Sequence, residues 1–81
     1  KETELEVSEI PKGKVKEAAE AYRVELAKLG CKVISEDRSF TKNRVIFVLR
    51  APRNQTETRM TAALCEHVPA EVRGEIDWEV E

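Results

Sequence analysis

The sequence predicts an α+β domain with the order strand–helix–strand–strand–helix–strand. Apolar side chains recur at every second position in four stretches, which is the period of a half-buried strand, and at three- and four-residue steps in two others, which is the period of a helix. The 81 residues are enough for a single domain, and a chain of this length buries only about 60% of its unfolded surface. We therefore expect residues 1–81 to form one sheet covered by a pair of helices.

The first strand and the first helix are adjacent in the chain. Leu5 and Val7 alternate with glutamates over residues 3–8, and residues 10–13, which include a proline and a glycine, interrupt this pattern. The helix that follows ends at Gly30, a residue type that readily adopts the left-handed conformation of a helix C-terminus. The apolar stripe of this helix consists of Val15, Ala18, Ala19, Tyr22, Leu26 and Leu29.

A β-hairpin is predicted next. Residues 31–39 form its first strand, residues 41–43 its turn and residues 44–50 its second strand. This second strand has apolar side chains on both faces. We expect Val45, Phe47 and Leu49 to face the helices, and Ile46 and Val48 to face the other way.

The second helix and the last strand complete the pattern. Asn54, with Glu57 three residues later, resembles a capping box and predicts where the helix begins, and Pro69 predicts its end. The last strand is expected from about Glu75 onward. Three of its side chains are predicted to face the core: Ile76, Trp78 and Val80.

This order of elements is the signature of the ferredoxin-like fold, which the ACT-like domains share. The right-handed crossover rule then places both helices on one face of an antiparallel four-stranded sheet with the spatial order 4-1-3-2. The two outer positions of the sheet are occupied by the second and fourth strands.

Composition excludes some classes of function. The 14 basic and 16 acidic residues give a net charge of −2, whereas nucleic-acid binders usually carry a basic excess. The longest unbroken apolar run is residues 45–49, and a bilayer-spanning helix needs about 20 residues, so we expect no membrane insertion by this segment. Cys31 and Cys65 form no CxxC pair and are expected to be free thiols; the alternative, a single disulfide between them, is left open by the sequence.

One half of the predicted open face of the sheet is acidic. The first and last strands are neighbours in this fold, and their outward side chains are carboxylates. Such a row either keeps an edge strand solvated and protected from aggregation or attracts Mg²⁺ or Ca²⁺. We expect no dedicated metal or cofactor site. The row consists of Glu4, Glu6, Glu75, Asp77 and Glu79.

The other half of that face is apolar at its centre. Ile46 and Val48 lie on the middle strand, with Arg44 and Arg50 at its two ends. Because exposed apolar pairs at the centre of a sheet often mark protein contacts, we expect this face to meet a second copy of the domain or the rest of a longer parent chain.

We predict that the domain is not an enzyme. No pair of titratable groups is placed for acid–base chemistry. His67, the only histidine, has no second ligand at metal-binding spacing, and Cys65 points away from it on a helix. Gly13 is either a turn residue or a glycine that lets a small ligand approach the start of the first helix.

Two family resemblances add to this interpretation. The glycine in the first loop and the passage Leu-Gly-Cys-Lys-Val at residues 29–33 are similar to ACT regulatory domains. This resemblance implies a dimeric module that binds an amino acid or a similar ligand near Gly13. The acidic residues usual in such loops are replaced here by Pro11, Lys12 and Lys14.

Residues 68–80, with a short loop leading to a strand that contains Trp78, and residues 45–52 resemble the C-terminal domain of MgtC/SapB-type membrane proteins. This resemblance implies a regulatory, ACT-like domain on the cytoplasmic side of the inner membrane, tethered behind several membrane helices and linked to magnesium limitation and virulence. The first residue is Lys1 and not Met, so we expect an excerpt from a larger membrane protein, with the parent membrane domain or a second copy as partner.

Overall fold

A computed structural model describes residues 2–80, and its strands and helices follow the predicted order. A short 3₁₀ turn, η1, lies between the second helix and the last strand. The elements are β1 (Glu2–Ser8), α1 (Val15–Lys28), β2 (Lys32–Ser39), β3 (Arg44–Arg50), α2 (Glu57–His67), η1 (Ala70–Val72) and β4 (Glu75–Val80).

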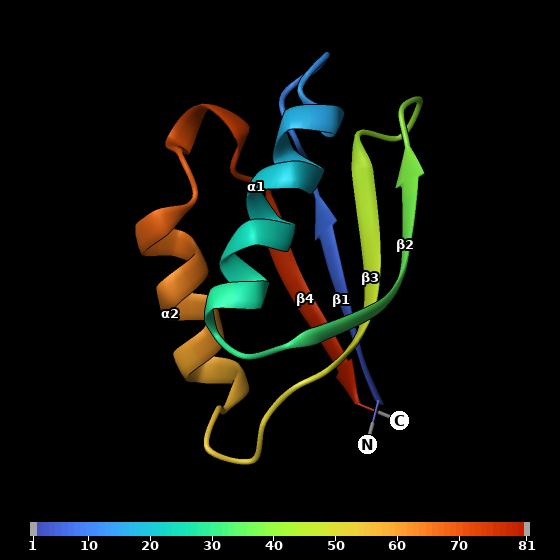
Figure 1. The fold of residues 1–81 in the computed structure, drawn as a ribbon. Helices are drawn as coiled ribbons and strands as arrows, with labels where there is room; N and C mark the ends of the chain where they lie inside the picture. The colour runs from blue at the N-terminus through green and yellow to red at the C-terminus, as the bar shows by residue number, and fades with distance from the viewer. Residues whose placement is uncertain (1, 81) are drawn as a thin grey trace.

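The sheet is antiparallel with the order β2-β3-β1-β4, which is the predicted 4-1-3-2 arrangement read from the opposite edge. Both helices lie on the same face of this sheet (Figure 1). The strand order and the helix placement are those of the ferredoxin-like fold, so the predicted fold class is confirmed. The opposite face of the sheet is covered by neither helix.

The core lies between the sheet and the helices. Side chains of β1 and β3 alternate strictly between buried and partly exposed positions, as the period of two predicts. Each fully buried aliphatic or aromatic side chain contributes about 1.5–3 kcal/mol to folding. Among the largest buried side chains are Leu5 and Val7 of β1, Tyr22 and Leu26 of α1, Val45, Phe47 and Leu49 of β3, and Leu64 of α2.

Helix α1 ends as the sequence predicts. Gly30 has a φ of +87°, its N–H donates to the carbonyl oxygen of Ala27, and the Cys31 N–H donates to that of Leu26. This pair of bonds is a Schellman motif, which satisfies the last carbonyls of the helix. Because it engages the Cys31 amide, β2 begins at Lys32, one residue later than predicted.

One sequence prediction about the second half of the chain is wrong, and another holds only in part. Asn54 does not cap α2, because the helix begins two residues later: the side chain of Thr56 accepts a hydrogen bond from the Arg59 N–H at 3.1 Å. Val80 lies on the helix side of the sheet as predicted, since its register partner Thr3 is buried there, but it does not pack into the core because 53% of its surface is exposed. It is the last residue of β4, which is an edge strand of the sheet.

Two side-chain hydrogen bonds fasten the C-terminal part of the chain to the helices. Trp78, which faces the core as predicted and is partly buried, donates from Nε1 to the Thr61 hydroxyl at 2.7 Å. The Gly74 N–H donates to the hydroxyl oxygen of Tyr22 at 3.1 Å. Burial raises the pKa of this Tyr22 hydroxyl, so it stays neutral at physiological pH.

Candidate interaction surface

The face of the sheet opposite the helices, here called the open face, carries most of the residues that the sequence singled out. The strand register fixes which side chains stand next to each other on it. The open face comprises Lys32, Ile34, Ser35, Asp37 and Ser39 of β2; Arg44, Ile46, Val48 and Arg50 of β3; Glu2, Glu4, Glu6 and Ser8 of β1; and Glu75, Asp77 and Glu79 of β4.

The two predicted arginines of the open face are engaged in ion pairs with β1. Arg44 Nη1 lies 3.0 Å from Glu6 Oε2, and Arg50 Nη2 lies 3.5 Å from Glu2 Oε2. Exposed pairs of this kind add only about 0–1 kcal/mol to stability. Their effect on the surface is larger, because they neutralise the boundary between β3 and β1. The sequence had not singled out Glu2, since its partner depends on the register.

The acidic row lies where the sequence placed it. Glu4 is paired in register with Glu79, and Glu6 with Asp77. Glu6 is neutralised by Arg44, whereas Glu4, Asp77 and Glu79 form no ion pair within residues 2–80. No group of three His, Cys, Asp or Glu side chains in the described part of the chain is arranged to hold a metal ion. The row is thus a stretch of negative surface along β1 and β4.

The apolar part of the open face is larger than the sequence indicated. Ile46 and Val48 are partly exposed, as expected for this face. Beside them, β2 contains a register shift: Val33 pairs with Leu49 but Ser35 pairs with Val48, so Ile34 is an extra residue. Such a bulge bends the strand and leaves its extra residue without a partner. Ile34 is 44% exposed, does not pack against the core and adjoins Ser35, the register partner of Val48, so the apolar area extends onto β2.

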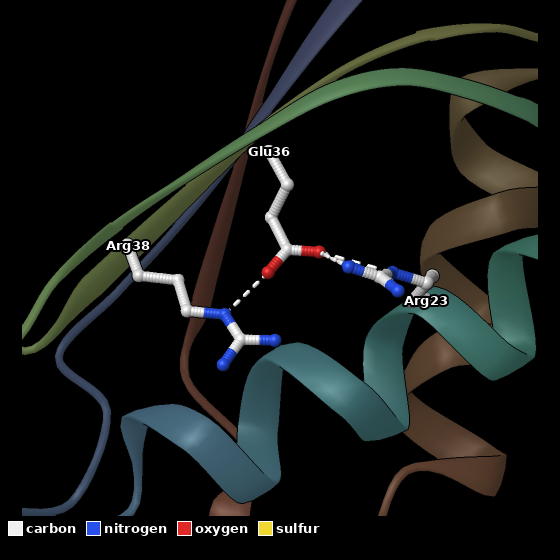
Figure 2. A network of polar contacts seen from close by, with 3 residues as sticks. All are labelled: Arg23, Glu36 and Arg38. Atoms are coloured by element: carbon white, nitrogen blue, oxygen red, sulfur yellow. Dashed lines mark hydrogen bonds and ion pairs between the residues drawn. The ribbon is translucent and has the colours of Figure 1, made fainter.

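On the opposite side of β2, a partly buried carboxylate joins the sheet to α1. The two oxygens of Glu36 accept hydrogen bonds from Arg23 of α1 and from Arg38 of β2 (Figure 2). The Arg23 Nε–Glu36 Oε1 distance is 3.0 Å. Burial alone raises the pKa of Glu36, but the hydrogen bonds and charges of the two arginines outweigh it and lower the pKa below its usual range. Charged side chains at inward positions explain why β2 lacks a clean apolar pattern.

The predicted ligand-approach residue, Gly13, occupies an exposed turn. Its φ is +79°, and the Lys14 N–H donates to the Pro11 carbonyl at 3.0 Å, which closes the turn. The positive φ by itself accounts for a glycine here. A Cβ built on Gly13 would have no neighbour within 4 Å, and α1 begins without a side-chain cap. Ligand approach at this position stays a prediction.

The remaining residues with reactive side chains lie apart from the open face. Cys65 and His67 are both exposed on α2. Cys31 is buried, both thiols are free, and burial raises the pKa of the Cys31 thiol. No pocket is present within residues 2–80. None of the helices described has the length and apolar character needed to cross a membrane.

The comparisons with known proteins concern the fold. No family model matches this chain, and no curated protein does. Among solved structures, it is similar to the P2 domain of the chemotaxis kinase CheA from the thermophile Thermotoga maritima, which was solved in complex with the response regulator CheY. The TM-score is 0.74 with 16% sequence identity, and the match covers 98% of this chain and 95% of that one. At this identity the likeness shows a shared α+β fold.

Proposed function

We propose that this chain is a non-enzymatic regulatory domain that binds another protein surface through its open face. The observation that carries the proposal is the apolar area formed by Ile34, Ile46 and Val48 on the side of the sheet that no helix covers. Apolar area gains about 25 cal/mol per Å² when a partner removes it from water. The similar P2 domain of CheA was solved with a protein partner, which supports the proposal by analogy of fold alone.

The resemblance to MgtC/SapB-type proteins supports a more specific form of the proposal. In it, residues 1–81 are a regulatory domain on the cytoplasmic side of the inner membrane, excerpted from a multi-pass protein linked to magnesium limitation and virulence. The surface that binds the open face then belongs to the parent membrane domain or to a second copy. Residues 68–80 and 45–52 carry the resemblance.

Cysteine accessibility tests the proposed surface. Ile46→Cys and Val48→Cys are introduced separately with Cys65→Ser, which removes the exposed native thiol. Maleimide labelling of each variant is compared between the purified 81-residue chain and the natural full-length protein in its own cells. The control is Val24→Cys on α1, where the native side chain is 51% exposed and faces away from the sheet.

The proposal predicts that labelling at positions 46 and 48 is several-fold slower in the natural protein than in the isolated chain, while labelling at position 24 is unchanged. A partner that covers the open face shields the first two thiols and leaves the third in water. Equal labelling rates in both preparations at all three positions would show that nothing covers this face.

The second candidate function is an ACT-type module that binds a small ligand near Gly13. The open space around Gly13 and the uncapped start of α1 favour it, because the free backbone N–H groups there can meet an anionic group. Thermal unfolding with amino acids and divalent cations tests it. A melting temperature that rises with the concentration of one compound supports binding, and constant melting temperatures across the series exclude it for those compounds.

A further inference from the structure

The open face changes character from one edge to the other. On β2 and β3 its centre is apolar, with Ile34, Ile46 and Val48, and β2 adds one cation, Lys32, and one carboxylate, Asp37. At the boundary between β3 and β1, the charges cancel in two ion pairs. Beyond that boundary the surface is acidic. Four carboxylates there form no ion pair within residues 2–80: Glu4, Glu75, Asp77 and Glu79.

This layout restricts the chemistry of any surface that binds it. A carboxylate loses its hydration when a partner covers it, and this weakens binding unless a cation or hydrogen-bond donors replace the water. A partner must therefore present cations over β1 and β4. It must also present apolar side chains over Ile46 and Val48, because charged groups there would be buried against hydrocarbon.

A second copy of this chain packed with its strands aligned to those of the first does not meet both requirements. Two sheets packed face to face by a two-fold axis across the strands bring β4 over β4, so Asp77 and Glu79 approach their own copies. An axis along the strands brings β3 over β1, which sets Ile46 and Val48 against Glu4 and Glu6. The first arrangement opposes like charges, and the second buries carboxylates on apolar side chains.

One amphipathic helix fits the dimensions of the face. Strands lie about 4.8 Å apart, so the four strands present roughly 19 Å across, and seven-residue strands are roughly 23 Å long. A helix is about 10–12 Å wide, and a helix of about 15 residues is as long as the strands. When such a helix lies over β3 and β1, its apolar stripe contacts Ile46 and Val48. Lysine or arginine side chains on one flank then reach the carboxylates of β4, because their long stems extend over the sheet.

We propose that the occupant of the open face is a basic amphipathic helix of a protein partner, with its apolar stripe on β3 and its cationic flank on β1 and β4. The inference rests on the proposed function and adds the chemistry of the partner. The charges of Glu4, Asp77 and Glu79 determine the orientation of the bound helix, because its cationic flank must face β4.

Two designed peptides test the inference with the purified 81-residue chain. One is a 15-residue helix with leucine along one stripe and lysine elsewhere, and the other has glutamate in place of each lysine. Backbone amide NMR shifts of the labelled chain report where each peptide binds. We expect the lysine peptide to shift amides of β1, β3 and β4, and the glutamate peptide to leave them unchanged.

A charge-reversal variant separates specific binding from general attraction to an acidic chain. The double variant Asp77→Lys with Glu79→Lys should bind the lysine peptide about tenfold or more weakly, since two attractive contacts become repulsive. The control variant, Glu20→Lys with Glu66→Lys, makes the same change in net charge on the exposed helix surfaces. Its affinity for the lysine peptide should stay within about twofold of the wild-type value. Ile46→Ser should also weaken binding, because it removes the apolar contact.

Three results would overturn the inference: equal binding of both peptides, equal losses in the two charge-reversal variants, or shifts confined to the helices. The labelling experiment at positions 46 and 48 judges the proposed function separately. If those positions are shielded in the natural protein while the lysine peptide fails, the open face is an interface and its partner is not a basic helix. If they are not shielded, the proposed function fails as well.

Discussion

Replacing Gly74 by alanine should strongly destabilise this domain. Gly74 lies just before β4, where the chain passes close to the end of β1. A Cβ at this position would lie 2.9 Å from Val7 Cγ1 and 3.0 Å from Ile10 Cγ1, and closer still to the carbonyl oxygen of Ser8. Because that oxygen belongs to the backbone, it cannot move aside as a flexible side chain would. The start of β4 must shift away from β1 instead.

The expected loss follows from two terms. Forcing an extra carbon into a tightly packed site costs about 1–3 kcal/mol. The shift also lengthens the hydrogen bond from the Gly74 N–H to the Tyr22 hydroxyl, which is worth about 1 kcal/mol. The sum of about 2–4 kcal/mol is a large part of the roughly 4–12 kcal/mol expected for a chain of this length. For a domain of this size it corresponds to a fall in melting temperature of about 12–24 °C.

Thermal and urea unfolding followed by circular dichroism measure the effect. Gly13→Ala is the matched control, because a Cβ there meets no atom within 4 Å and only its φ of +79° opposes the substitution. That conformation costs about 1–2 kcal/mol. We expect Gly74→Ala to lower the free energy of unfolding clearly more than Gly13→Ala does. If Gly74→Ala unfolds at the wild-type temperature, or if the two variants lose the same amount, the close approach of β4 to β1 is not what requires glycine.

Two further predictions concern polar contacts. Glu36→Gln should cost about 1–3 kcal/mol at neutral pH because it weakens charged hydrogen bonds to two arginines. The folded-state pKa of Glu36 lies below its ordinary value of 4.5, so the stabilisation by this carboxylate is complete above pH 4.5 and is lost as the pH falls through the lowered pKa. The unfolding free energies of wild type and variant should therefore converge in acid. A constant difference between them down to pH 2 would contradict this prediction. Thr61→Val should cost about 1 kcal/mol by urea unfolding, because it removes the acceptor of the Trp78 N–H, and should alter the tryptophan fluorescence. An unchanged stability and spectrum would show that this hydrogen bond does not form in solution.

The candidate surface was partly predictable from the sequence. Once the order of strands was known, alternation placed Ile46 and Val48 on the open face, and the neighbouring first and last strands gave the acidic row. The ion pairs of Arg44 and Arg50 were not predictable, since the partner of each depends on the register between β3 and β1. The bulge that exposes Ile34 was not predictable either, because one extra residue makes the alternation irregular without showing where the bulge lies.

By itself, the sequence determined the order of the elements, the apolar stripes and the Gly30 end of α1, because periodicity and helix capping act over a few neighbouring residues. Only the tertiary structure decided that Glu36 bridges two arginines and that Gly74 must pass close to Ser8. Both features join segments that lie far apart in the chain. Packing of the whole domain fixes these distances, and no local pattern encodes them.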